Sequence, residues 1–184
     1  MSQDSYNNYA DMPSYPMMMF QHLMENNELI WRLLGYNSPD AWNQSNLTKA
    51  EKGALIWAGE GYTNDFRCFM DDGQPDAETS EITLLHIMNY GLSPLNPTIG
   101  TVQILIEAYS HYKINTMSNY LTRVDVIMQQ MLETFNGVTL DTLGSVGAIS
   151  FDKLGSGSSR LAIGGQLPFR GKWMILTVKS GKST

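Results

Sequence analysis

Residues 101–112 read TVQILIEAYSHY, and residues 119–135 read NYLTRVDVIMQQMLETF. In the first stretch apolar residues alternate with other residues, which predicts a strand with one buried face. In the second stretch apolar residues recur every three or four positions, which predicts an amphipathic helix that ends at Asn136-Gly137. We expect the apolar face of this helix to pack on the sheet that contains 101–109. That face comprises Leu121, Val124, Ile127, Met128, Met131, Leu132 and Phe135, and the polar face comprises Arg123, Asp125, Gln129, Gln130 and Glu133.

The segment before this unit has the pattern of a helical extension. Residues 1–16 are rich in Asn, Ser, Tyr and Pro without periodicity, so we expect an N-terminal arm that becomes ordered only on a partner. Residues 17–34 have helical spacing, with Pro16 at the first position and Gly35 where a left-handed cap would end the helix.

A second, shorter helix is expected over residues 48–58, because Thr48 and Glu51 have the spacing of a capping box. Residues 82–88 have the composition of a strand, and the Gly and Pro residues in 91–100 predict a long turn.

The C-terminal part has three strand candidates, at 146–151, 160–167 and 172–179. Gly155–Ser159 joins the first two and predicts an exposed loop. The order of elements predicts an α+β fold: a small antiparallel β-sheet or partial barrel packed with one amphipathic helix, plus an N-terminal helical segment.

We expect three parts in the chain. Residues 1–16 form the arm, 17–61 the helical N-terminal segment, and 62–184 the α+β core.

Charge is unevenly distributed along the 184 residues, whose net charge is −6. This net charge argues against a free-standing nucleic-acid binder. Residues 152–184 hold six basic residues and one acidic residue, whereas 1–151 hold six basic and 17 acidic residues. The asymmetry is either a solvated, scattered charge or a basic end that meets an acidic surface of a neighbour.

The sequence offers no set of residues for catalysis, for a cofactor or for a metal site. His22, His86 and His111 lie far apart, and the single cysteine, Cys68, fits a small buried residue. The opening residues do not resemble a signal peptide, and no stretch approaches the ~18 apolar residues needed to span a bilayer. We therefore expect a non-enzymatic chain made in a cytoplasm, without a membrane partner.

The stretch from about Thr101 to Val178 resembles small neck proteins of tailed bacteriophages, namely the head-closure and tail-terminator subunits. The shared plan is a strand with a polar turn (TVQILIEAYSHYKI), a helix with an early basic residue and an Asn-Gly end (YLTRVDVIMQQMLETFNG), and a β-meander. The meander ends on Phe169, Arg170, Gly171, Met174, Leu176 and Val178. The segment NNELIWRLLGYNSPDAW is similar to the opening helix of connector-region proteins.

The resemblance implies a virion protein that forms a ring in the neck. It implies portal or adaptor proteins on one side, tail proteins on the other, and DNA that passes without sequence-specific binding. Head closure and tail terminator both remain open, as do another tail, baseplate or adaptor subunit and a small enzyme or regulatory binding domain. Six residues are the candidate oligomer interface: Arg160, Phe169, Arg170, Lys172, Met17 and Met18.

Overall fold

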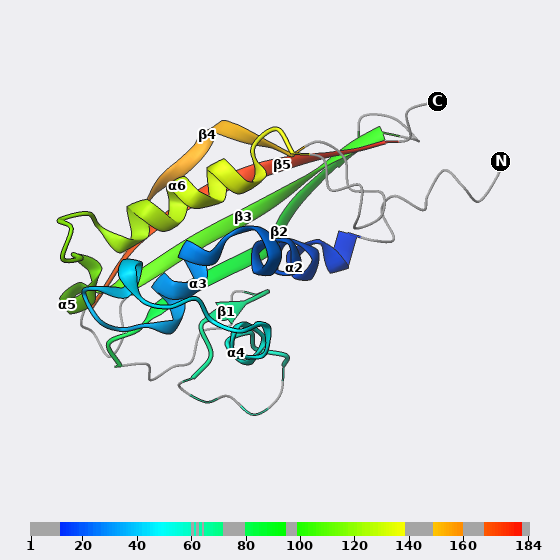
Figure 1. The fold of residues 1–184 in the computed structure, drawn as a ribbon. Coiled ribbons are helices and arrows are strands. Elements are labelled where there is room, and N and C mark those ends of the chain that lie inside the picture. Colours follow the sequence, from blue (N-terminus) through cyan, green and yellow to red (C-terminus); the bar gives the residue numbers. More distant parts are fainter. Residues whose placement is uncertain are drawn as a thin grey trace.

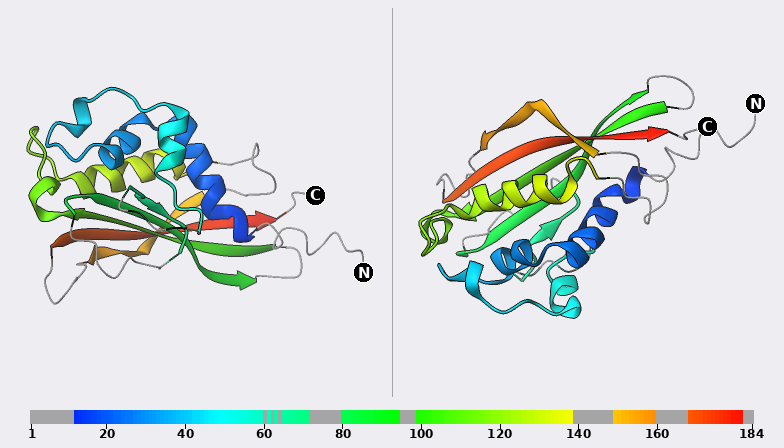
Figure 2. Two further views of the ribbon diagram at one scale, coloured as in Figure 1. Left: turned by 90° about the horizontal axis from the view of Figure 1, so that it is seen from below. Right: turned by 45° about the horizontal axis from the view of Figure 1, so that its top comes forward.

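The computed structural model describes residues 12–59, 61, 63, 65–71, 80–94, 99–138, 149–159 and 168–181. Helices lie on one face of a five-stranded sheet, as Figures 1 and 2 show. The expected α+β class is confirmed.

The sheet is mixed, although most of its strand pairs are antiparallel. Its order is β1-β2-β3-β5-β4, and β1 pairs with β2 in parallel. The expectation of an all-antiparallel sheet missed β1 because this strand has two residues in a polar region. The strands are β1 (Cys68–Phe69), β2 (Thr83–Pro94), β3 (Ile99–His111), β4 (Ile149–Ser159) and β5 (Phe169–Gly181).

Strand β3 is the centre of the sheet, and its alternation is confirmed. Val102, Ile104, Ile106 and Ala108 have no exposed surface, and they lie in the main hydrophobic core. Helix α6 (Arg123–Phe135) contributes to the same core, so its apolar face packs on the sheet as expected.

Helix α6 begins later than the sequence pattern predicted. Thr122 is its N-cap residue, and Tyr120 has a positive φ of 65°, which an α-helix does not contain. Leu121 was expected on the apolar face, but it precedes the helix and is 53% exposed. At the other end Gly137, with φ 80°, stops the helix as expected.

The expected helix over 17–34 is in fact two helices. Helix α2 (Tyr15–Asn26) ends at Asn27, whose backbone is extended, and α3 (Glu28–Gly35) follows at once. The side chain of Asn27 explains the break: its Oδ1 accepts the Ile30 N–H at 3.0 Å, which caps α3. Its amide group also donates to Gln130 and Thr134 of α6, so the break attaches both helices to α6.

Two local expectations for this region were wrong. Tyr15 is 1% exposed and belongs to α2, so the chain is already packed before residue 17; residues 1–11 of the expected arm lie outside the described residues. Gly35 is the last residue of α3 and does not adopt a left-handed backbone. Its lack of a side chain serves packing instead, because a Cβ there would lie 2.8 Å from Leu47 Cδ2.

Helix α4 (Lys49–Ala54) confirms the capping box. Thr48 Oγ1 accepts the Glu51 N–H, and the Glu51 carboxylate accepts the Thr48 N–H at 2.7 Å. These hydrogen bonds also lower the pKa of Glu51 below its usual value.

Two segments that were expected to be a turn and a loop are paired in the sheet instead. β2 runs on through Gly91 to Pro94, and β3 begins at Ile99, so most of the long turn expected over 91–100 is strand. Gly155–Ser159 lies in β4 and is no free loop, since Ser156 pairs with Met174. Glycine is needed there: a Cβ on Gly157 would lie 2.8 Å from the indole nitrogen of Trp173. The strand expected at 160–167 lies outside the described residues.

Candidate assembly surfaces

A buried arginine of α6 holds the C-terminal end of α3 against the start of α6. Arg123 has no exposed surface; its Nη1 donates to the carbonyls of Leu33 (2.9 Å) and Tyr36 (2.6 Å), and its Nη2 donates to Ser38 (2.7 Å). Burial lowers the pKa of Arg123 to about 10, so the guanidinium is still charged at neutral pH. A cation at the C-terminal carbonyls of α3 is favourable. The expectation that Arg123 faces solvent with the polar side of the helix was therefore wrong.

The loop of residues 116–122, between α5 (Tyr112–Asn115) and α6, has a rigid backbone. Thr116 and Thr122 form an isolated antiparallel bridge across its base. Inside the loop the Tyr120 N–H donates to Met117 O, and the Met117 N–H donates to Leu121 O, both at 2.9 Å. Met117 is buried, so the loop is anchored to the core as well.

Helix η3 (Ala41–Asn43) holds the same loop from the side. The Ser118 N–H donates to Pro39 O at 3.0 Å, and the Trp42 indole N–H donates to Ser118 Oγ at 2.9 Å. Figure 1 shows this loop next to α5, at the end of the sheet opposite the N-terminus of α2.

The rigid loop displays a large aromatic side chain in a strained conformation. Tyr120 is 91% exposed, and its φ of 65° lies in the left-handed region. For a residue with a Cβ this conformation costs roughly 1–2 kcal/mol. Leu121 and Trp42 are also exposed, at 53% and 36%. The hydrogen bonds within the loop hold this conformation, and they leave the aromatic ring of Tyr120 exposed instead of packed on the subunit.

A groove lies between α2 and α4, with a volume of about 400 Å³. Its lining combines apolar and polar side chains. The apolar ones are Met17, Met24, Ile56 and Ala58, and the polar ones are Gln21, His22, Glu25 and Lys49.

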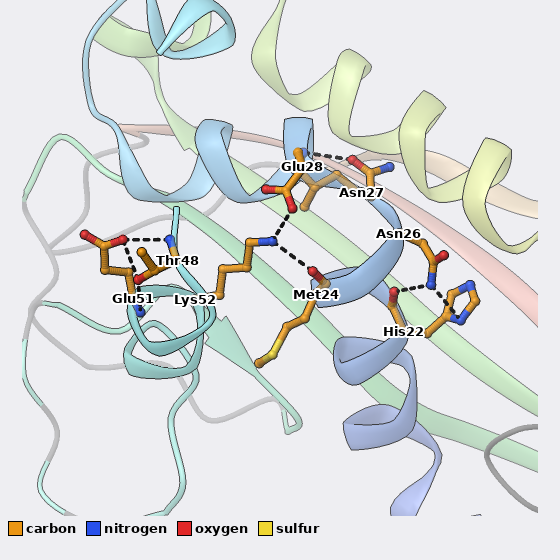
Figure 3. A network of polar contacts seen from close by, with 9 residues as sticks. His22, Met24, Asn26, Asn27, Glu28, Thr48, Glu51 and Lys52 are labelled. Carbon is orange, nitrogen blue, oxygen red and sulfur yellow. Dashed lines mark hydrogen bonds and ion pairs between the residues drawn. The ribbon is translucent and has the colours of Figure 1, made fainter. Parts of the chain in front are cut away.

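A buried lysine determines how α4 sits against α2 and α3. Figure 3 shows Lys52 reaching from α4 to the Met24 carbonyl (2.8 Å) and to the Glu28 carboxylate (2.6 Å). Close by, the Asn26 amide donates to the His22 carbonyl at 2.9 Å, which holds the end of α2. The walls of the groove are thus fixed, while its methionine side chains can adapt to an occupant. Burial lowers the pKa of His22, and the nearby Glu25 opposes this in part.

The candidate interface residues that the structure describes do not form one surface. Met17 lines the groove, and Met18 is partly buried against the main core. Phe169 has no exposed surface and packs edge-on against His111, so it offers nothing to a neighbour in this structure. Arg160 lies outside the described residues.

The two remaining basic candidates, Arg170 and Lys172, are half-buried on β5. Lys172 forms an ion pair with Asp125 of α6 at 2.6 Å, so this charge is used within the subunit. Burial would raise the pKa of Asp125, but hydrogen bonds from Lys172 and Thr122 outweigh it and hold the pKa below its usual value. Arg170 Nη1 lies 3.5 Å from the carbonyl oxygen of Phe169.

Sequence reasoning missed the strongest surface feature, the display of Tyr120. One signal was available: Thr122 and Asp125 have the spacing of a helix start, which would have placed Tyr120 and Leu121 outside the helix. The indole contact between Trp42 and Ser118 joins residues 76 positions apart and had no local signal.

Cys68 and His86 are buried within the fold. Cys68 is fully buried, as expected, and burial raises the pKa of its thiol. His86 stacks on Phe69, with 5.0 Å between ring centroids. Among the described residues, no cluster of three or more His, Cys, Asp or Glu side chains could hold a metal ion. No helix in these ranges is long and apolar enough to cross a membrane.

The fold and these surfaces define an α+β protein with a rigid aromatic display and a methionine-lined groove. The family model YomW matches residues 27–161, which is more than half of the chain. The chain therefore belongs to the YomW family, which is phage-derived. No curated protein matches the chain.

Proposed function

We propose that this chain is a structural subunit of a tailed-phage particle, which assembles with copies of itself into a ring in the neck. In this role it joins the portal or an adaptor to the tail, and DNA passes through the ring. The phage-derived family supports a role in a phage. The proposed position in the neck rests on the resemblance of residues 101–178 to head-closure and tail-terminator subunits.

The observation that carries the proposal is the display of Tyr120 and Leu121 on a rigid loop. Exposed aromatic side chains on a preorganised backbone are typical anchors of protein interfaces, because little entropy is lost when they bind. The loop has six polar or backbone contacts that hold it in place within the subunit. A protein that acts through contacts with other subunits needs such a surface.

The chemistry of the described side chains favours this role over catalysis. A catalytic site brings titratable groups together in a pocket that substrate can enter. Here Cys68 and Arg123, whose pKa values are strongly shifted, are both buried, and Arg123 is occupied by main-chain carbonyls. The groove between α2 and α4 has one histidine and one close acid–base pair at its rim, Glu25 and Lys49.

The test is a nonsense mutation in the gene for this chain, in a phage or prophage that produces particles. We expect DNA-filled heads and complete tails that do not join, and complementation by a plasmid copy should restore joined particles. Mass spectrometry of purified virions should detect the chain, and labelled antibody should bind at the neck.

Two results would contradict the proposal. Purified virions that lack the chain would exclude a structural role. Particles whose tails or baseplates are absent or incomplete would place the chain in the tail, which is the alternative left open by the sequence.

A further inference from the structure

We infer that the loop of residues 116–122 of one copy docks in the groove between α2 and α4 of the next copy, with Tyr120 as the inserted side chain. This inference rests on the proposed self-assembly and names the two surfaces that meet.

The loop is built as a projection that can enter a groove. Tyr120 is 91% exposed in a left-handed backbone conformation, and the loop is held by the bridge between Thr116 and Thr122 and by Ser118. An Asn or Gly at position 120 would suit this backbone better than Tyr. The backbone at position 120 disfavours any residue with a Cβ, and the exposed ring gains little packing within the subunit to offset that cost. We therefore assign the ring to a contact outside the subunit.

The groove has the chemistry that a tyrosine side chain requires. Met17, Met24 and Ile56 offer an apolar and adaptable surface to an aromatic ring, and sulfur–aromatic contacts are favourable. Gln21 and His22 at the rim can hydrogen-bond the phenolic hydroxyl. A volume of about 400 Å³ leaves room for Leu121 beside the ring.

Charge favours a second copy as the occupant. The chain carries a net charge of −6, so two copies repel each other unless the surfaces that meet are neutral or opposite in charge. The loop TMSNYLT has no charged residue, and the charged rim residues of the groove, Glu25 and Lys49, lie 4.0 Å apart and compensate each other.

The position of the two surfaces determines the kind of assembly. The groove is lined by residues of α2 and α4. Figures 1 and 2 show these helices at a different place on the molecule from the loop, which lies beside α5. A contact between two different surfaces is heterologous, and repetition of such a contact produces a ring when the rotation closes. This geometry connects the docking of the loop to a ring-shaped assembly.

Two substitutions test the contact without a threat to the fold. Tyr120→Asn removes the ring and suits the left-handed backbone, so the melting temperature should stay the same or rise. Gly53→Gln fills the groove; a Cβ at Gly53 meets no atom within 4 Å, and Gly is unfavourable inside a helix. Tyr90→Asn is the matched control, because Tyr90 is also exposed (61%) but lies on β2, outside both surfaces.

The measurement is sedimentation velocity of the full chain over a range of concentrations. We expect concentration-dependent association of the wild type and of Tyr90→Asn, and at least tenfold weaker association of Tyr120→Asn and of Gly53→Gln. An equimolar mixture of the two weak variants retains one intact loop and one intact groove, so it should form dimers and nothing larger.

The inference is overturned if the wild type stays monomeric, if either variant associates like the wild type, or if the mixture forms no dimers. Deletion of residues 1–11 should leave association intact. If that deletion abolishes association while Tyr120→Asn does not, the N-terminal segment occupies the groove and the inference is wrong. Failure of this contact leaves the proposed function standing, because that function is tested by the presence of the chain at the neck of the virion.

Discussion

Substitution of Arg123 by Met replaces a buried guanidinium with a shorter, unbranched apolar side chain. Three carbonyls, those of Leu33, Tyr36 and Ser38, would then lose a charged donor. Ser38 O also accepts the Ala41 N–H at 3.1 Å, so the larger loss falls on Leu33 and Tyr36. These acceptors are main-chain carbonyls, so they remain in place after the substitution.

The magnitude follows from the number of hydrogen bonds that are lost. Hydrogen bonds to charged groups contribute about 1.5–3 kcal/mol each. The substitution removes two to three such bonds, and the favourable burial of Met offsets part of the loss. We therefore predict that Arg123→Met lowers the free energy of unfolding by about 3–5 kcal/mol. Arg123→Lys keeps the charge but has no planar fork to reach all three carbonyls, so we expect about half of this loss.

The assay is urea unfolding followed by fluorescence, with hydrogen exchange as a second readout. Both variants should lower the midpoint at an unchanged slope, and Arg123→Met should accelerate exchange of amides between Leu33 and Trp42. A loss below about 1 kcal/mol for Arg123→Met would refute the reasoning, since it would mean that water or neighbouring amides satisfy the carbonyls as well as the guanidinium does.

Three further predictions concern the core and the titratable groups. Met128→Asp should lower the free energy of unfolding by about 3 kcal/mol or more, because the charge would lie on the buried face of α6; melting at the wild-type temperature would show that this face is not core. Asn27→Ala should lower the free energy of unfolding by about 2 kcal/mol, because the cap of α3 and the hydrogen bonds to α6 are lost together. A loss below about 0.5 kcal/mol in chemical denaturation would contradict this prediction. NMR titration should give pKa values below 6.5 for His22 and His111, since burial lowers both. Each imidazole then binds its proton more readily in the unfolded chain than in the folded one. The contribution of the two histidines to stability is therefore present above about pH 6.5 and is lost as the pH falls. Measured pKa values at or above 6.5 would contradict the prediction.

Part of the fold could be predicted from the sequence because it depends on local periodicity. The alternation around Ile104, the helical spacing from Val124 to Phe135 and the capping box at Thr48 all describe residues within a few positions of each other. These patterns predicted the central strand, the helix that packs on it and the start of α4.

The candidate site could not be predicted in the same way. Of the six candidate interface residues, Met17 lines a surface groove that now has a proposed role, whereas Phe169 is buried and Lys172 is paired within the subunit. Composition marks a residue as suited to an interface, but it does not show whether the same residue is already used inside the fold.

The sequence by itself determined which segments have a strand or helix period and which faces of those segments are apolar, because both properties follow from the backbone repeat. Tertiary structure alone decided three other features. Asn27 breaks a continuous helical pattern because its side chain can reach α6. Arg123 is buried because three carbonyls from residues 85 to 90 positions away converge on it. Tyr120 is displayed because Trp42 and the bridge at Thr116 hold its loop. Each of these depends on partners that are distant in sequence, and only the folded chain brings them within hydrogen-bonding distance.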